Sequence, residues 1–337
     1  MRMVTSLLST DELGQARTLL EESGLRFEPP YDDLVGVFES GRLVAVGARQ
    51  GRTLKMLAVA ASHRDGTLLE EVVAELLGRG HQEGVDSFFV FTSPSLVPSF
   101  QAIGFNLLAA SEKAALLEHG DGLRRYLARH DGQIGGGVNG AIVADCNPFT
   151  LGHRHLVEEA AASVDRLFLF VLREERSLFP FGARLRMAQD GTGDLGNVAV
   201  LDASRYAIST VTFPTCFLKE GDPEGAIRNE LDLLLFGERI APHFRVKTRF
   251  VEGGPWSGPN AAYHEAMRRI LPPLGVKVTE VDRKSALGSL ISASRVREML
   301  LRGELEGIAE LVPVTTLDFL LSSEGIKIWE KGGSGGN

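Results

Sequence analysis

The chain has 337 residues, of which 44% are hydrophobic and 24% charged, a globular composition that excludes a disordered or collagen-like protein. This length exceeds what one hydrophobic core usually serves, so we expect two domains. Acidic residues outnumber basic ones by 44 to 36, and the resulting net charge of −8 disfavours a nucleic-acid partner.

The first 131 residues mix strand and helix patterns in the manner of an α+β domain. Ser9 and Glu12 form a capping-box pattern, which predicts a helix from Thr10. Apolar runs predict strands at residues 34–39, 43–49, 53–60 and 86–92, with a helix from Leu68 between the last two. No apolar run reaches the roughly 18 residues that a membrane helix needs, so we expect no membrane partner.

A glycine-rich stretch over residues 132–140 divides the sequence. We expect a first domain over 1–131, a linker over 132–139, a second domain over 140–325 and a flexible tail over 326–337. In the second domain, strands predicted at 140–145, 166–172, 197–202, 247–251 and 277–281 alternate with helices at 153–163, 181–191, 226–236, 261–271 and 294–302. Such alternation indicates an α/β fold with a parallel sheet covered by helices on both faces.

The segment between the first strand and first helix of the second domain has the features of a phosphate site. It reads Asn147-Pro148-Phe149-Thr150-Leu151-Gly152-His153. The proline ends the strand, the glycine lets a ligand approach the backbone, and His153 stands in the first helical turn, where free N–H groups favour an anion. Open α/β sheets bind ligands at such strand ends. Alternatively, Thr150 caps the helix and His153 is a surface residue.

A second helix start, near the C-terminus, carries a similar set of hydrogen-bond donors. It reads Ile291-Ser292-Ala293-Ser294-Arg295-Val296-Arg297. Ser292 or Ser294 can cap this helix, and the guanidinium fork of Arg297 suits phosphate oxygens. Taken alone, a capped amphipathic helix with a solvated arginine is the commoner explanation of this pattern.

The two motifs, in this order, resemble the signature pair of the nucleotidyltransferase superfamily, Thr-x-Gly-His and Ile-Ser-x-Ser-x-x-Arg. The resemblance implies a Rossmann-like domain that binds ATP between the two helix starts and cleaves it between the α- and β-phosphates. It implies catalytic roles for His153, Arg297, Ser292 and Ser294 in stabilising the charge that develops. Mg²⁺ would bind through the phosphates, without a metal site built from protein ligands.

Further segments extend the resemblance to the citrate lyase ligase family, over most of residues 138–320. They are 147–154, 175–181 with Arg184, 208–215, 217–219, 231–232, 240–242, 249–251, 283–284 and 291–297. The resemblance implies that ATP is bound by Asn147, Pro148, Phe149, Thr150, Gly152, Arg184 and Ile291. The chain departs from the family pattern at 203–206, 253–256 and 263–264, in loops expected to face the acyl substrate.

The family resemblance also implies a reaction. Acetate attacks the α-phosphate of ATP, and the acetyl group of the resulting adenylate passes to the thiol of a CoA-like prosthetic group on the citrate lyase acyl-carrier subunit. No protein nucleophile is needed, so Cys146 beside the first motif is more simply an inert buried cysteine. Cys146 and Cys216 are too few for a disulfide framework, and we expect a reduced, cytoplasmic protein.

The N-terminal domain is expected to be GNAT-like, because members of this family begin with an acetyltransferase-like domain. Its phosphate loop would correspond to residues 63–68, where only Gly66 fits the usual pattern. Asp65 would repel a phosphate there, and the side chain of Leu68 would crowd it. We therefore expect this loop, through Arg64 and Gly66, to cradle the prosthetic arm of the carrier rather than to support free acetyl-CoA chemistry.

Two other functions stay open from the sequence. One is a nucleotidyltransferase with another small-molecule acceptor, which would leave adenylate on its product. The other is a protein that binds an acyl carrier without catalysis.

Overall fold

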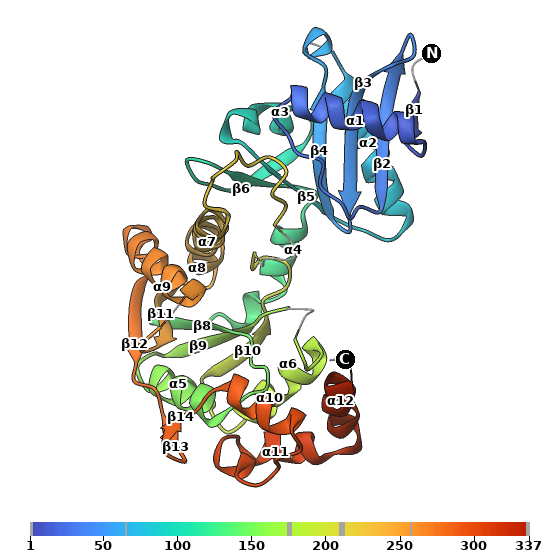
Figure 1. The fold of residues 1–337 in the computed structure, drawn as a ribbon. Helices are drawn as coiled ribbons and strands as arrows, with labels where there is room; N and C mark the ends of the chain where they lie inside the picture. Colours follow the sequence, from blue (N-terminus) through green and yellow to red (C-terminus); the bar gives the residue numbers. More distant parts are fainter. Residues whose placement is uncertain (1–2, 65, 174–176, 209–212, 257, 335–337) are drawn as a thin grey trace. The chain divides into compact units, whose positions relative to one another are not determined.

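The computed structural model describes residues 3–64, 66–173, 177–208, 213–256 and 258–334 (Figure 1). The chain forms two compact units, Met1–Tyr126 with Ile208–Leu235, and Leu127–Ala207 with Phe236–Asn337. The structure therefore differs from the expected continuous domain over 140–325, because helix α7 (Glu224–Leu235) packs against a strand of the first unit. Among the described residues, no helix combines the length and the apolar character needed to cross a membrane.

The first unit is built on a seven-stranded sheet in the order β1-β2-β3-β4-β5-β7-β6. Its elements are β1 (Val4–Ser6), α1 (Thr10–Glu22), β2 (Asp33–Glu39), β3 (Arg42–Gln50), β4 (Thr53–Val59), η1 (Ala61–His63), α2 (Leu68–Gln82), β5 (Phe88–Thr92), η2 (Pro94–Leu96), α3 (Val97–Ala102), β6 (Phe105–Ala110), β7 (Ala115–His119) and α4 (Gly122–Ala128). All neighbouring strands are antiparallel except β4 and β5, which run parallel.

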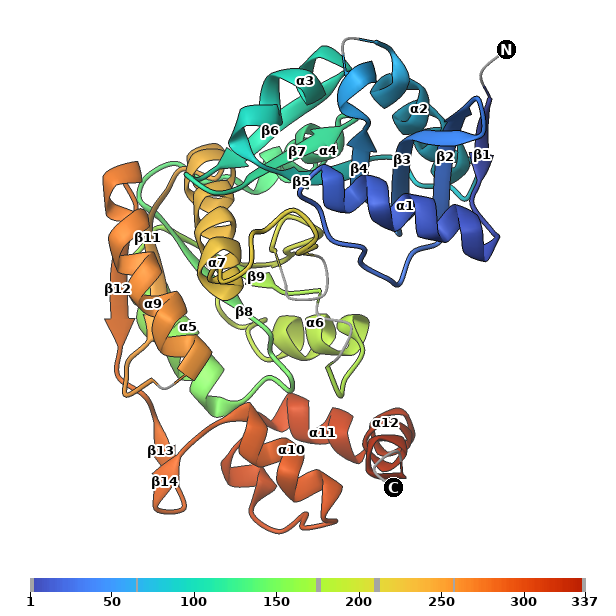
Figure 2. The ribbon, with the colours of Figure 1, turned by 45° about the horizontal axis from the view of Figure 1, so that its top comes forward.

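Two helices bury opposite faces of this sheet, as Figure 2 shows. Helix α1 packs a core containing Leu19 and Leu34, and α2 packs a separate core containing Val35 and Val72. Leu34 and Val35 are neighbours in β2, and successive side chains of a strand point to opposite faces. The expected start of α1 is confirmed, because Ser9 and Glu12 form the complete capping box.

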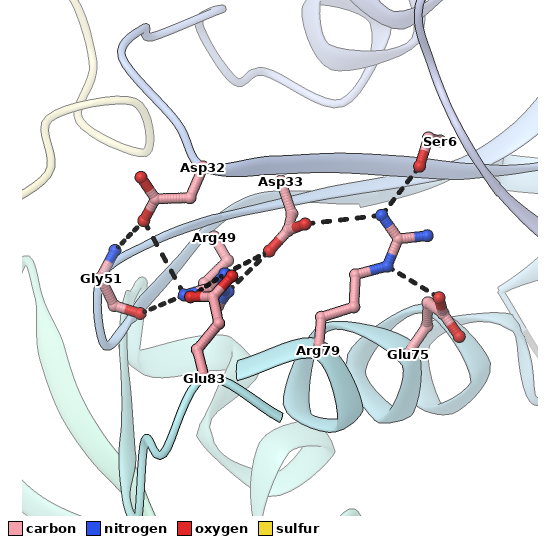
Figure 3. Close-up of polar contacts among 8 residues, drawn as sticks. All are labelled: Ser6, Asp32, Asp33, Arg49, Gly51, Glu75, Arg79 and Glu83. Carbon is pink, nitrogen blue, oxygen red and sulfur yellow. Dashed lines mark hydrogen bonds and ion pairs between the residues drawn. The ribbon is translucent and has the colours of Figure 1, made fainter. Parts of the chain in front are cut away.

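A buried arginine joins β3 to its neighbours (Figure 3). The side chain of Arg49 is 1% exposed, and its Nε donates to Asp33 at 2.7 Å while Nη2 donates to Glu83 at 2.8 Å. Arg79 contacts the same Asp33 carboxylate at 3.4 Å. Because two carboxylates balance the charge of Arg49, this network is a structural link rather than a ligand site.

The second unit contains a five-stranded, fully parallel sheet in the order β10-β9-β8-β11-β12, with a separate two-stranded hairpin. Its elements are η3 (Asp131–Gln133), β8 (Asn139–Ala144), α5 (Leu151–Ala162), β9 (Arg166–Val171), α6 (Phe181–Asp190), β10 (Val198–Asp202), η4 (Phe236–Ile240), α8 (Ala241–His243), β11 (Val246–Glu252), α9 (Gly258–Ile270), η5 (Pro272–Leu274), β12 (Lys277–Val281), β13 (Ser285–Ala286), β14 (Ser289–Leu290), α10 (Ala293–Leu301), η6 (Ile308–Glu310), α11 (Val314–Leu321) and α12 (Ser323–Ser334). This sheet and the mixed first unit confirm the expected α/β class.

The chain's last helix replaces part of the expected flexible tail. Helix α12 covers residues 323–334, and its Trp329 Nε1 donates to the carbonyl of Leu320 at 3.0 Å. Ile328 and Trp329 pack against the core that α5, α6 and α10 share. Gly332 and Gly333, two of the glycines that suggested a flexible tail, thus lie in the last turn of this helix.

Candidate active site

The site is set by the strand order of the parallel sheet. From β8 the chain moves outward through β9 and β10, and then returns to place β11 and β12 on the other side of β8. Strand order therefore reverses between β8 and β11, and α/β proteins of this kind bind ligands at the carboxyl ends of the strands flanking such a point. Residues 145–153 follow β8 there, and Glu252 ends β11 there.

Helix α5 begins at this edge with a reciprocal cap. The Thr150 Oγ1 atom accepts from the backbone N–H of His153 at 3.3 Å, and the Thr150 N–H donates to His153 Nδ1 at 3.0 Å. Since Nδ1 accepts a backbone N–H, the proton of the neutral imidazole belongs on Nε2, which is left as a donor. Thr150 thus caps the helix, as the simpler explanation held, and also fixes the tautomer of His153.

The environment of His153 keeps its imidazole uncharged. Burial lowers the pKa of His153 below its ordinary value of 6.5, against the smaller opposing effects of Glu252 and Asp145. The ring stacks on buried Phe149, with centroids 5.7 Å apart. His153 is therefore a rigidly held neutral hydrogen-bond donor at neutral pH.

The structure brings the second motif to the same place. Ser292 caps α10 by accepting from the N–H of Arg295 at 3.2 Å. Arg297 Nη1 donates to the carbonyl of Asn147 at 2.5 Å, and its Nη2 donates to Ser294 Oγ at 3.0 Å. Two helix starts about 150 residues apart in sequence therefore meet at one strand end.

Gly152 lies at the meeting point of the two motifs. A Cβ atom added there would lie 3.4 Å from the carbonyl oxygen of Ile291 and 3.6 Å from Glu252 Oε1. These are ordinary contact distances, so the fold itself would accept alanine. The missing side chain lets the segment that starts α10 lie against the first turn of α5 at this point.

Arg184 has a different environment from the one that a phosphate ligand needs. Its side chain is fully buried, and it donates to the carbonyls of Asp145 and Leu172 and to the Asp145 carboxylate, each at 2.6–2.7 Å. Its Nε also donates to the carbonyl of Phe179 at 2.9 Å. Arg184 thus ties together the ends of β8 and β9, and it positions the loop in which Asn147 lies.

The remaining residues of the first motif build the loop. Phe149 is fully buried, Pro148 is buried, and the side chain of Asn147 accepts from the N–H of Phe179 at 3.2 Å. Cys146 is also fully buried, and burial raises the pKa of its thiol, so it is poorly suited to act as a nucleophile. Residues 175–176 of the family segment 175–181, and 209–212 of 208–215, lie outside the described residues.

Two carboxylates at this edge were not singled out from the sequence, and Arg283 entered only as part of the family segment 283–284. Asp145 follows β8, Glu252 ends β11, and Arg283 follows β12 and contacts Glu252 at 3.3 Å. Each carboxylate thus has its own guanidinium, Arg184 for Asp145 and Arg283 for Glu252. Their shared position, at the carboxyl ends of predicted parallel strands, is the signal that could have found them.

The expected arm-binding loop lies in the first unit, at the start of α2. The N–H of Gly66 donates to the carbonyl of His63 at 3.3 Å, and Arg64 is the C-cap residue that follows the short helix η1. Leu68 is 1% exposed and packs in the core, so the expectation that its side chain would crowd a phosphate was wrong. Asp65 lies outside the described residues.

The comparisons with known proteins agree with the site. Residues 139–320 match the model of the citrate lyase ligase C-terminal domain. A [citrate [pro-3S]-lyase] ligase from Klebsiella pneumoniae is 37% identical over 83% of this chain and 84% of its own length. The chain belongs to the citrate lyase ligase family. A second citrate lyase ligase, from Escherichia coli, is 32% identical over 92% of this chain and 90% of its own length.

This membership confirms the resemblance seen in the sequence, and it makes the chain an enzyme of the ligase class. Among solved structures, an acetyltransferase of the GNAT family from Desulfovibrio desulfuricans matches 36% of this chain and 99% of its own length, with 15% identity and a TM-score of 0.31. The structure of the Escherichia coli protein ElaA matches 35% of this chain and 99% of its own length, with 13% identity and a TM-score of 0.30.

Proposed function

We propose that this chain activates citrate lyase in the cytoplasm, by ATP-dependent acetylation of the thiol on the prosthetic group of its acyl-carrier subunit. The observation that carries the proposal is the hydrogen bond from Arg297 to the carbonyl of Asn147, which joins the α10 and α5 starts at the switch point of the sheet. Family membership supports this choice of substrates, and the meeting of the two helix starts supports binding of the triphosphate of ATP there.

In the first step, an acetate oxygen attacks the α-phosphorus of ATP. The new phosphorus–oxygen bond forms as the bond to the β-phosphate oxygen breaks, and pyrophosphate leaves with that electron pair. His153 Nε2 and the guanidinium of Arg297 donate to the phosphate oxygens on which negative charge increases. The positive end of the α5 dipole adds to this, while the N–H groups of Leu151 and His153 donate to the Leu311 carbonyl and to Thr150 Oγ1. Mg²⁺ carried on the phosphates would supply further positive charge.

In the second step, the carrier thiolate attacks the acetyl carbonyl of the adenylate. The carbon–sulfur bond forms as the carbon–oxygen bond to the phosphate breaks, and AMP leaves with that electron pair. Adenylation is needed because acetate itself has no good leaving group. The protein contributes binding and orientation here, so a cysteine or serine nucleophile is not required.

The direct test is mass spectrometry of the thiol-form carrier after incubation with the enzyme, ATP, Mg²⁺ and acetate. We expect the carrier to gain the mass of one acetyl group in place of a hydrogen, with AMP and pyrophosphate in solution. A carrier that gains an adenylyl group would instead indicate a nucleotidyltransferase. Formation of a stoichiometric complex without pyrophosphate release would indicate a non-catalytic binding protein.

We further propose that the loop of Arg64 and Gly66 holds the prosthetic arm during the second step. A Cβ at Gly66 would meet only the carbonyl of His63, at 3.5 Å, so Gly66→Ala should fold normally. We expect this variant to slow carrier acetylation several-fold while acetate-dependent pyrophosphate release is unchanged. Gly78→Ala in α2, where a Cβ has no neighbour within 4 Å, is the matched control. Equal slowing of both steps would contradict this role.

A further inference from the structure

Arg249 is a buried cation that the reaction described above does not use. It lies in β11, between β8 and β12, opposite Ala141 of β8 and Val278 of β12, and its residue exposure is only 3%. Within 4.0 Å of its guanidinium there is no carboxylate among the residues that the structure describes. Its charge is therefore not balanced by an acidic side chain of that part of the chain.

A comparison with the other buried arginines shows that a buried guanidinium without a carboxylate partner is unusual in this chain. Arg49, Arg184 and Arg249 are the buried arginines of the described ranges. Arg49 lies 2.5 Å from Asp33, and Arg184 lies 2.7 Å from Asp145. Only Arg249, of these three, lacks such a partner. The two buried arginines with a purely structural role are thus each paired with a carboxylate.

The contacts of Arg249 hold its guanidinium in place without neutralising it. Nη2 donates to the hydroxyl of Tyr263 at 3.0 Å, and the group faces the ring of Phe236 at 4.6 Å. Its buried Nε has no hydrogen-bond acceptor among the described residues. Aromatic faces attract a cation, but they do not recover the cost of burying a full charge with an unused donor. A bound anion would supply what is missing.

The position of Arg249 relates this group to the proposed reaction. It precedes Glu252 by three residues on β11, a separation of roughly 10 Å along a strand, and Glu252 lies against Gly152 at the start of α5. On the α9 side, His264 follows Tyr263 and stacks on Trp256 with ring centroids 3.8 Å apart. Arg249 thus lies on a strand that flanks the switch point. Its side chain points to the face of the sheet with Phe236 and Tyr263, whereas Glu252, three residues on, points to the α5 face.

We propose that Arg249 is the receptor for the carboxylate of the short acid that is activated, with Tyr263 as the residue that positions its guanidinium. This inference rests on the proposed function. A guanidinium matches a carboxylate with two parallel N–H donors, and the aromatic surroundings suit a short apolar substituent such as the methyl group of acetate. Of the departures from the family pattern, 263–264 lie in helix α9 rather than in the expected loop. Tyr263 bonds Arg249 and His264 stacks on Trp256, so these departures would affect which acid is accepted.

The test compares Arg249→Lys with Lys247→Arg in the full-length enzyme. Lys247 lies two residues earlier on β11, and its side chain is exposed. The Michaelis constants for acetate and ATP are measured, together with binding of ¹³C-labelled acetate, and separately of inorganic phosphate, by NMR without ATP. We expect Arg249→Lys to weaken acetate binding and raise KM for acetate by about tenfold or more, because a bidentate charged contact is lost. KM for ATP should stay within about twofold, and Lys247→Arg should behave as wild type.

Tyr263→Phe covers the case in which Arg249→Lys fails to fold, because it keeps the arginine and removes one acceptor. It should raise KM for acetate by a smaller factor and leave KM for ATP unchanged. The proposal is overturned if acetate binding and KM are unchanged in a folded Arg249→Lys enzyme, if KM for ATP rises equally, or if only phosphate binding depends on Arg249. Arg249-dependent acetate binding by a wild-type protein that releases no pyrophosphate would uphold this receptor and reject the proposed function.

Discussion

Replacing His153 with alanine is expected to lower acetate-dependent pyrophosphate release by about 100- to 1,000-fold, the usual effect of removing one preorganised donor to a developing charge. The imidazole is held for this role, because Thr150 N–H donates to its Nδ1 at 3.0 Å and Phe149 stacks on its face. Thr150 Oγ1 would still accept the backbone N–H of residue 153, so the helix cap survives the substitution. The measurement is pyrophosphate release under saturating ATP, with a thermal melt to verify folding.

His155→Ala is the matched control, because His155 lies two residues further along α5. It should change the rate by less than about twofold. Near-normal turnover of His153→Ala, with the melt unchanged, would show that this imidazole has no part in the chemistry.

The lowered pKa of His153 adds a pH dependence to this prediction. Between the folded-state pKa and 6.5, the unfolded chain takes up a proton that the folded site does not, so stability falls as the pH falls through that range. His119, His130 and His264 also have pKa values lowered mainly by burial, and they contribute in the same direction. His153→Ala should therefore lose less stability than wild type on acidification from pH 7 to pH 5, as measured by urea unfolding.

Replacing Arg49 with methionine is expected to cost about 3–5 kcal/mol of unfolding free energy, because removing one member of a buried ionic network strands its partners. Asp33, whose side chain is 14% exposed, would keep only the longer contact from Arg79 at 3.4 Å (Figure 3). The carbonyl of Gly51 would also lose the donor Nη1, now 3.0 Å away.

The measurement is urea unfolding of the full chain, monitored by a spectroscopic probe placed in the first unit. Arg124→Met is the control, since that side chain is 80% exposed and pairs with Asp121 on the surface, where such pairs contribute at most about 1 kcal/mol. A loss below about 1 kcal/mol for Arg49→Met would mean that the network does not stabilise the unit.

The regular elements of the second unit were largely predictable, because local signals determine them. Strands β8 to β12 and helices α5, α6, α9 and α10 lie within a few residues of the apolar runs and caps that predicted them. The short strand β1 and the β6–β7 hairpin were not predicted. Their pairing with β2 and β5 depends on distant residues, which a local pattern does not contain.

The placement of α7 was beyond sequence reasoning for a related reason. Its apolar spacing indicates a helix with one buried face, but not the sheet that this face covers. In the structure α7 packs on β6 in the first unit, although the strands before and after it, β10 and β11, belong to the parallel sheet of the second. Tertiary packing determines which sheet α7 covers, and the alternation of strands and helices in the sequence does not indicate it.

The candidate site also has a part that local motifs predicted and a part that depends on contacts between distant segments. His153, Thr150, Ser292 and Arg297 belong to short motifs, and spacing alone placed them at helix starts. The meeting of Arg297 with the carbonyl of Asn147, and the pairing of Glu252 with Arg283, join segments far apart in the chain. The burial of Arg184 was also hidden, because an arginine near a phosphate motif gives no sign of pointing into the core.

A crystal structure with a non-hydrolysable ATP analogue and Mg²⁺ tests the central claim most directly. We expect its triphosphate to lie on the first turn of α5, within hydrogen-bond distance of both His153 Nε2 and the Arg297 guanidinium. An analogue bound elsewhere, or one that engages only one of these side chains while the other faces a separate cavity, would contradict the account.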